Sequence, residues 1–385
     1  MNFDIAIVGG GIIGVTAGRW LAERGLKVCV VERGKLASGT SGANFSWVNA
    51  SQKTTDAKYH HLNALGVRLY ADLGDELGYE ALGLRRSGSI AVAAGTTGVT
   101  ALKGQAARLT ELGYPNRLLE PVELQALEPQ VIFAPGTSGL LAPSDMILDA
   151  ARFVGAMAAR IRALGGEVVE DCPALELLSD DDGQVSGLRT SEGEIATARV
   201  LIAAGPDTPD VLAALTGFDG FAARFPVVRV PGLLVTTPPV SPGLVRHLLV
   251  RDTPDEFHVF PDFNGGLRLG SDDADARITE DSSVNEQRDA ARLLLARMQA
   301  LAPGFAGEAC LDDCHIRIGI RAVPQDGISI AGPLPGAEGV FVIATHSGVT
   351  LAPALASLMA GVIADGVVPD MLKPFTLDRL PGFGG

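Results

Sequence analysis

Cysteine and lysine are scarce in this chain, and both shortages limit what the protein can be. Four cysteines occur among 385 residues, at positions 29, 172, 310 and 314, without the spacing of a metal site. A chain of this length with so few cysteines is not a disulfide scaffold, so we expect a reducing, cytoplasmic setting and no metal centre. The six lysines form no basic run, and the net charge is −14. We therefore expect no nucleic-acid partner, because phosphate binding needs clustered basic side chains.

Long charge-free runs are also few, and two of them could be mistaken for targeting or membrane segments. Residues 5–18 carry no charge, but Asp4 precedes them where a secretion signal would have Lys or Arg. Residues 339–364 contain no Asp, Glu, Lys or Arg and are long enough to span a bilayer. The pattern predicts a buried strand, a turn and a helix instead of a membrane span. This run holds five residues that favour this interpretation: His346, Ser347, Gly348, Thr350 and Pro353.

The most informative segment is the N-terminal one, DIAIVGGGIIGVTAGRWLAERGLKVCVVER. It predicts a strand, a turn, a helix and a second strand, with Gly9, Gly11 and Gly14 at GxGxxG spacing and Glu32 18 residues later. Gly9 permits the tight turn, Gly11 lets backbone approach a pyrophosphate, and Gly14 lets helix and strand pack closely. The helix N-terminus adds partial positive charge, and Glu32 can accept hydrogen bonds from a ribose diol. The segment predicts a site for NAD or FAD and disfavours NADP.

The remaining sequence predicts that nucleotide-binding segments recur in the middle and at the end of the chain. DAARFVGAMAARIRALGGEVVED is typical of a helix, a Gly-Gly stop and a strand, and RVLIAAG ends another strand at Ala204 and Gly205. Residues 315–366 predict strand, turn, strand, turn and long helix, whereas 83–94 and 225–271 are strand-rich. We expect further helices at 56–77, 99–112, 121–127 and 285–301.

Five motifs are spread over nearly the whole chain: GGGIIG, ASGTSGAN, IAAG, GIRAVPQDG and THSGVTLAP. In this combination the chain resembles the D-amino acid oxidase, glycine oxidase and sarcosine oxidase family of FAD-dependent oxidoreductases. The resemblance implies an α/β fold, with a Rossmann-like FAD-binding domain assembled from residues 1–80, 141–222 and 308–385. An α+β substrate domain with an antiparallel sheet would comprise 81–140 and 223–307. Two domains are also the ordinary expectation for a chain of 385 residues.

The resemblance implies that the cofactor is FAD. The loop after the second strand suits an anion on physical grounds as well, because small residues let backbone amides approach and hydroxyls add donors. Amides at the N-terminus of the C-terminal helix can stabilise negative charge at the N1–C2=O edge of a flavin. The residues expected at the cofactor are Gly9, Gly11, Ile12, Ile13, Gly14, Glu32, Arg33, Thr40, Ser41, Gly42, Asn44, Ser46, Trp47, Ala174, Ala204, Gly205, His346, Ser347, Gly348, Val349 and Thr350.

Three residues are expected to be catalytic from their places in the family's motifs. Arg321 matches the arginine that binds substrate carboxylate, which a guanidinium holds bidentately; the alternative is a structural arginine paired with Asp326. His258 stands where glycine oxidase-like relatives have an active-site tyrosine. Arg268 replaces a lysine of sarcosine oxidase-like relatives that lies near the flavin, which favours an acceptor other than oxygen. Gly319 replaces the cysteine that tethers flavin in some relatives, so we expect noncovalent FAD.

These features predict an enzyme that oxidises a C–N bond of a small amino acid or N-substituted amino acid. Hydride would pass from the α-carbon to flavin N5, and water would hydrolyse the resulting imine. Its partners would be that substrate and oxygen or another electron acceptor, in a possible homo- or hetero-oligomer. One alternative is the FAD-binding subunit of a hetero-oligomeric amine or opine dehydrogenase. A flavin monooxygenase is disfavoured because its GD-type motif is not found, and a NAD dehydrogenase leaves the C-terminal motifs unexplained.

Overall fold

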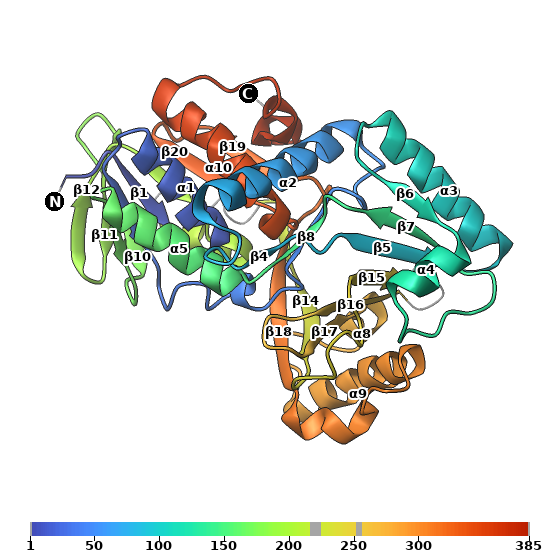
Figure 1. The fold of residues 1–385 in the computed structure, drawn as a ribbon. Coiled ribbons are helices and arrows are strands. Elements are labelled where there is room, and N and C mark those ends of the chain that lie inside the picture. Colours follow the sequence, from blue (N-terminus) through green and yellow to red (C-terminus); the bar gives the residue numbers. More distant parts are fainter. Residues whose placement is uncertain (1, 216–224, 252–255, 384–385) are drawn as a thin grey trace.

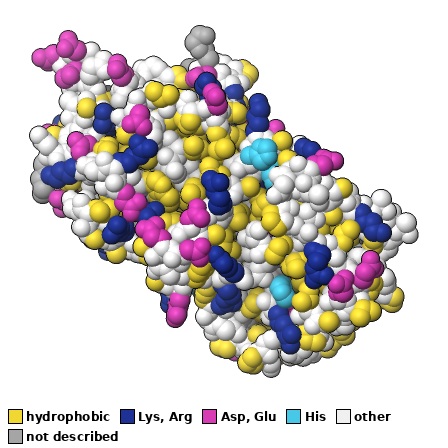
Figure 2. Space-filling view, turned by 45° about the horizontal axis from the view of Figure 1, so that its top comes forward, with side chains coloured by type: hydrophobic (Ala, Val, Ile, Leu, Met, Phe, Trp, Pro, Cys, Tyr) yellow, Lys and Arg dark blue, Asp and Glu magenta, His cyan; other side chains and the backbone are white. Residues whose placement is uncertain are grey.

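The computed structural model describes residues 2–215, 225–251 and 256–383. Within these ranges the strands form four sheets, of six, three, eight and three strands. Figure 1 shows the six-stranded sheet with its helices in one half of the molecule and the eight-stranded sheet with α9 in the other. On the face drawn in Figure 2, basic and acidic side chains are interspersed, so the net charge of −14 is not gathered into one block there.

The six-stranded sheet is the dinucleotide-binding sheet that the N-terminal sequence predicts. Five strands run parallel because helices and longer connections return the chain to the same edge, and the sixth, β19, is antiparallel to β20. The central strand β1 (Ile5–Val8) is entirely buried, as a strand covered on both faces must be. The sheet order is β19 (Ile330–Pro333), β20 (Val340–Ala344), β13 (Val200–Ile202), β1, β2 (Val28–Val31) and β9 (Glu167–Val169).

Helices cover this sheet, and one of them is apolar throughout. Helix α1 (Ile12–Glu23) packs against α5 (Ala150–Ala163) and α10 (Gly348–Asp365), and α10 in turn packs against α2 (Ala57–Leu77). In the described residues, α10 is the one helix long and apolar enough to cross a bilayer, and 61% of it is buried inside the protein. The strand, turn and helix predicted over 339–364 are therefore confirmed as β20, a turn and α10.

The eight-stranded sheet forms a second layer with its own helices. Its strands are antiparallel to their neighbours except that β15 pairs parallel with β5. Helix α9 (Val284–Leu301) covers part of it, with a Ser283–Glu286 capping box at its start. The order is β18 (His315–Pro324), β14 (Val227–Thr236), β17 (Leu267–Gly270), β16 (Phe257–Pro261), β15 (Leu248–Arg251), β5 (Ser89–Ala93), β7 (Ser138–Ala142) and β6 (Arg117–Leu119).

Two three-stranded sheets and four further α-helices complete the described part of the chain. One of these sheets is antiparallel and follows the order β3 (Trp47–Val48), β8 (Met146–Leu148) and β4 (Leu84–Arg85). An antiparallel sheet of β10 (Ala174–Ser179), β11 (Val185–Thr190) and β12 (Gly193–Ala196) lies at one end of the molecule (Figure 1). The remaining described helices are α3 (Gly95–Glu111), α4 (Pro121–Leu127), α6 (Thr208–Ala214) and α8 (Asp272–Asp275). The four predicted helices correspond to α2, α3, α4 and α9, with α3 beginning four residues before the predicted Val99.

The backbone hydrogen bonds between strands place β18 and β7 in sheets that do not follow the expected domain boundaries. Strand β18 was expected with the FAD-binding segment that begins at 308, but it pairs with β14 over ten residues in the eight-stranded sheet. The boundary between 140 and 141 falls inside β7. The local sequence of β18 predicts a strand but not its partner, because alternating apolar residues suit either sheet. The division into two domains stays a proposal, with β18 shared between them.

Candidate cofactor and substrate site

A cavity of about 1060 Å³ lies between the six-stranded and eight-stranded sheets. One wall is formed by the carboxyl ends of β1, β2, β13 and β20, which is where open α/β sheets bind ligands. The other wall comes from β14, β16, β17 and β18. Segments far apart in the sequence thus meet at one cleft large enough for a cofactor and a small substrate.

The three fingerprint glycines do different mechanical work at the cofactor wall. A Cβ built on Gly9, whose φ is +118°, would lie 2.5 Å from the carbonyl oxygen of Ala203. A Cβ on Gly14 would lie 2.0 Å from the carbonyl oxygen of Gly9, so helix α1 could not sit this close to β1 with a larger residue. At Gly11 the nearest atom is Ser41 Oγ at 3.1 Å, which leaves the backbone open to the cavity. This cradle fits the pyrophosphate of a dinucleotide.

Glu32 is fixed at the end of β2 by two backbone amides. Its Oε2 accepts a hydrogen bond from Gly10 N at 2.7 Å, and its Oε1 accepts one from Gly34 N at 2.9 Å. The carboxylate still lines the cavity, where it can accept from a ribose diol. The neighbouring Arg33 lies at the rim and forms a 2.6 Å ion pair with Asp207.

The loop that follows β2 is folded by its own side chains. Ser41 Oγ accepts from Ile12 N at 2.9 Å, so this loop is attached to the N-terminus of α1. Asn44 Oδ1 accepts from Ser46 N at 2.6 Å, and Ser46 adopts a positive φ of 61°. Such a conformation costs a non-glycine residue free energy and persists only where the surroundings hold it. Hydrogen bonds therefore give this loop one defined shape along the cavity.

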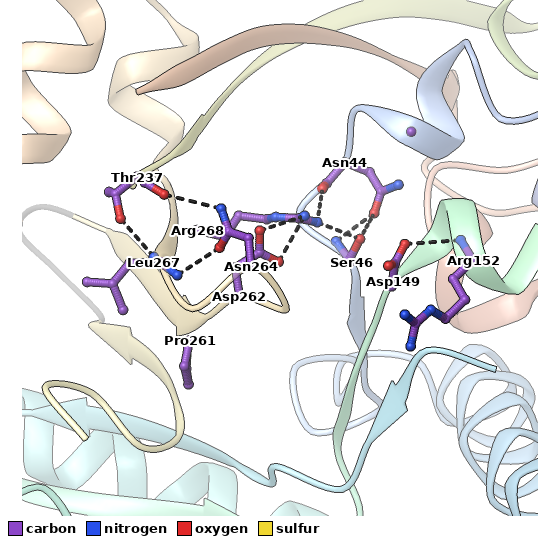
Figure 3. A network of polar contacts seen from close by, with 12 residues as sticks. Asn44, Ser46, Asp149, Arg152, Thr237, Pro261, Asp262, Asn264, Leu267 and Arg268 are labelled. Atoms are coloured by element: carbon purple, nitrogen blue, oxygen red, sulfur yellow. Dashed lines mark hydrogen bonds and ion pairs between the residues drawn. The ribbon is translucent and has the colours of Figure 1, made fainter. Parts of the chain in front are cut away.

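Arg268 supports this loop from behind instead of lining the cavity. Its Nη1 donates to Ser46 Oγ at 2.9 Å and to Asn44 O at 3.3 Å, and its Nη2 lies 3.0 Å from Asp262 Oδ1 (Figure 3). The guanidinium also lies over the ring of Phe260, 5.4 Å from its centroid. Strand β17 thus directs this side chain to the loop, and Arg268 is not part of the cavity lining. The expected catalytic role of Arg268 stays a prediction, and these contacts favour a positioning role.

The turn THSGVTLAP leads directly into α10 at the cavity. The first amides of α10, at Gly348, Val349 and Thr350, have no partner within the helix and lie on the cavity lining. His346 opens into the cavity beside them. Desolvation by the surrounding cavity walls, together with the positive charges of Lys53 and Arg321, lowers the pKa of His346 to about 4. The imidazole is therefore neutral at neutral pH.

Arg321 lines the cavity from β18, and its partner is not the one that the sequence offered. Its Nη2 donates to Asp275 Oδ2 at 2.7 Å and to Pro231 O at 2.8 Å, while Asp326 pairs with Arg379. The guanidinium lies against Gly232, where a built Cβ would be 3.1 Å from its central carbon. Among the described residues Nη1 has no hydrogen-bond partner. One side of the guanidinium is thus anchored, and the other can receive a carboxylate.

His258 belongs to an aromatic and acidic part of the wall. Its ring centroid lies 5.5 Å from Phe45 and 6.0 Å from Trp47, and its Nε2 is 3.0 Å from Glu256 Oε1. The hydrogen bond with Glu256 raises the pKa of Asp272 to about 6, whereas the contact with His258 lowers the pKa of Glu256 to about 2. Of the two carboxyl groups, that of Asp272 therefore takes up a proton first as the pH falls below neutral.

Most of the predicted cofactor residues line this one cavity, and the exceptions have structural explanations. Gly14 lies behind the turn, and a Cβ on Gly42 would lie 2.3 Å from the carbonyl oxygen of Ala37, so both serve packing. The sequence argument missed Asp275, Glu256, Asp272 and Lys53, which also line the cavity. For Lys53 a signal existed, because only six lysines occur and this one follows the cofactor loop. No local pattern marks the three acids.

The fold and the site are those of a dinucleotide-dependent oxidoreductase, with the dinucleotide-binding sheet facing the eight-stranded sheet across the cavity. The sequence matches the FAD dependent oxidoreductase family over residues 4–362, and the chain belongs to this family. It is 26% identical to a glycine oxidase of Geobacillus kaustophilus (strain HTA426), covering 98% of this chain and 97% of that protein. It is 25% identical to one of the subunits of opine oxidase from Agrobacterium tumefaciens (strain Ach5), covering 98% of this chain and 97% of that one. The crystal structure of glycine oxidase from Geobacillus kaustophilus superposes with a TM-score of 0.83 at 25% identity, over 99% of this chain and 100% of that one.

This membership decides between NAD and FAD, which the fingerprint alone left open. FAD is the cofactor, and the protein is a FAD-dependent oxidoreductase. The glycine cradle, Glu32 and the α10 N-terminus are the parts of this chain that fit it.

We expect denaturation to release FAD without proteolysis. Strand β18 crosses so close to the loop that a Cβ built on Gly319 would lie 1.8 Å from the carbonyl oxygen of Ala43. A cysteine there would displace the loop, so this chain lacks room for the tether. The check is acid precipitation followed by absorbance of the supernatant, with Cys314→Ser as a matched control that should behave identically. Flavin that stays on the precipitate in the wild type but not in that variant would contradict the expectation.

Proposed function

We propose that this protein oxidises the C–N bond of a small amino acid or N-substituted amino acid with FAD. The observation that carries the proposal is Arg321, whose guanidinium faces the same cavity as the dinucleotide-binding turns. When held along the glycine turns and the N-terminus of α10, FAD would supply the two-electron oxidant for the amine, and water would hydrolyse the resulting imine. The glycine oxidase relatives support the reaction class, since their names state oxidation of an amino acid.

The residues of this chain bind and orient the substrate. Arg321 holds the carboxylate, and Asp275 with Pro231 O fixes the plane of the guanidinium. This fixed geometry places the α-carbon at one distance from the cofactor wall. The neutral His346 and the rings of Phe45 and Trp47 border the same space without adding charge beside the reacting bond. A substrate whose amine is already neutral needs no dedicated base.

The test is anaerobic reduction of the purified yellow protein. Glycine, N-methylglycine, D- and L-amino acids and simple amines without a carboxylate are added in turn, and flavin absorbance is followed. Bleaching by one or more carboxylated amines, with an imine-derived keto acid or aldehyde as product, supports the proposal. Bleaching only by amines without a carboxylate would remove the assigned role of Arg321. No bleaching by any member of the panel would contradict the proposal for the isolated chain.

A second candidate is the FAD-binding subunit of a larger dehydrogenase. The observation that favours it is the similarity to the opine oxidase chain over nearly the full length of both proteins. In that case the isolated chain binds FAD but reacts slowly, and partner chains from the same source restore turnover. Gel filtration of the protein purified from its native source, with identification of copurified chains, separates the two candidates.

A further inference from the structure

Lys53 is a cation of the cavity wall that has no role in the proposed reaction. It lies on the segment between β3 and α2 and is partly buried. Among the described residues no carboxylate lies within ion-pair distance of its Nζ. Burial lowers the pKa of Lys53, and the carboxylate of Glu256 partly offsets that effect. A half-buried ammonium without an ion pair is unfavourable unless a ligand supplies the anion.

The backbone that carries Lys53 is held in place on both sides. Ser51 Oγ donates to the buried Asp145 at 2.6 Å, and Gln105 Nε2 donates to Ser51 O at 3.0 Å. The Nδ1 of His60 lies 3.1 Å from Lys53 O, and Lys53 N donates to Ala50 O at 3.1 Å. These contacts present the side chain from a fixed position, unlike a surface lysine on a mobile loop.

Lys53 and Arg321 line the same cavity from different segments, Lys53 from the segment between β3 and α2 and Arg321 from β18. Both positive charges act on His346, so the imidazole lies within electrostatic range of each. Their surroundings differ, however. Arg321 is compensated by Asp275 at 2.7 Å, whereas Glu256, the acid that acts on Lys53, is already bonded to His258 at 3.0 Å. The cavity lining therefore holds one cation anchored by an ion pair and one cation without an ion pair, and the neutral ring of His346 belongs to the same lining.

We propose that Lys53 and Arg321 bind the two carboxylates of a substrate whose oxidised amine lies between them. The substrate class is an N-carboxyalkyl amino acid, in which each carbon attached to the secondary amine carries a carboxylate. This inference rests on the proposed function and narrows its substrate. The amine stands in the middle of such a molecule, so two cations on the lining of one cavity can hold its two ends. Oxidation converts one C–N bond to C=N, with two electrons and one proton passing to FAD, and water then releases a 2-oxo acid and a primary amino acid.

Binding can be tested separately from turnover. Diglycolate and methoxyacetate carry an ether oxygen in place of the amine, so they are unreactive counterparts of iminodiacetate and N-methylglycine. Each is titrated into the FAD-loaded protein, and Kd is read from the shift of the flavin spectrum. We expect diglycolate to bind tighter than methoxyacetate, and Lys53→Gln to weaken diglycolate alone by about 10- to 100-fold, as for loss of one charged hydrogen bond. Lys53→Arg should retain part of the preference, and Lys58→Gln, an exposed position five residues on, should change nothing.

Kinetics complete the test, because other roles of Lys53 give different patterns. In anaerobic reduction, Lys53→Gln should raise the apparent KM for iminodiacetate and leave N-methylglycine unchanged. An equal loss of the limiting rate with both substrates would overturn the inference and assign Lys53 to the flavin instead. Stronger binding of aspartate than of iminodiacetate would overturn the placement of the second carboxylate. Failure of all amino acids to reduce the flavin, with the diglycolate preference intact, would contradict the proposed reaction but not the paired cations.

Discussion

Replacing Arg321 with alanine is expected to leave FAD bound and to lower kcat/KM for the best carboxylated substrate about 30-fold to several thousand-fold. The range corresponds to about 2–5 kcal/mol for truncating one partner of a buried charged pair, with about 1.4 kcal/mol per factor of ten. Two effects combine here. The substrate carboxylate loses its bidentate partner, and the carboxylate of Asp275, 14% exposed, loses its cation. The flavin spectrum should stay unchanged, since Arg321 belongs to the substrate wall.

Three comparisons isolate this effect. Arg321→Lys keeps the charge but not the planar fork, so its activity should fall between wild type and Arg321→Ala. Arg379→Ala removes another arginine–aspartate pair, with Asp326 at 2.9 Å, outside the cavity, and should keep wild-type kcat/KM. A simple amine without a carboxylate, if oxidised at all, should be little affected by Arg321→Ala. An unchanged kcat/KM on a carboxylated substrate would refute the assigned role.

Replacing Arg268 with alanine is expected to weaken FAD binding and lower the melting temperature of the protein. The Arg268 guanidinium joins Asp262, which is 7% exposed, to Asn44 and Ser46 of the cofactor loop. Its removal leaves that carboxylate buried without this cation, which typically costs about 3–5 kcal/mol. It also releases Ser46 from its left-handed conformation at the edge of the cofactor site. Measurements of FAD dissociation and of thermal unfolding with and without added FAD check the expectation.

The same variant separates a positioning role from a role in oxygen chemistry. After reconstitution with excess FAD, reduced Arg268→Ala protein should react with oxygen at a rate close to that of wild type, because the guanidinium faces the back of the loop. Double replacement of Arg268 and Asp262 by apolar residues should recover part of the lost stability, since no buried charge then stays unpaired. Tight FAD binding with a large change in reoxidation rate would contradict the positioning role and restore a direct role at the flavin.

The N-terminal sequence by itself determined the kind of cofactor site. A GxGxxG turn between an apolar strand and a helix is a local structure, because its requirements fall on contiguous residues. Gly9 adopts a φ of +118°, and a Cβ on Gly14 would lie 2.0 Å from the carbonyl oxygen of Gly9, so the strand–turn–helix geometry itself requires glycine at both positions. The helices of 57–77, 121–127 and 284–301 were likewise readable from apolar periodicity and capping residues.

The tertiary structure decided which side chains form the substrate end of the cavity. Arg321 pairs with Asp275, 46 residues away, and Arg268 bonds to Asn44, 224 residues away. The sequence around these residues does not predict either pairing. The first pairing depends on β18 joining β14, and the second depends on β17 packing behind the cofactor loop. A motif can show that an arginine stands on a strand. Which residues its guanidinium contacts depends on the face of the sheet that it occupies and on the loop that packs against that face. The same holds for Lys53, whose charge can serve a ligand only because the fold places it on the same cavity lining as His346 and Arg321.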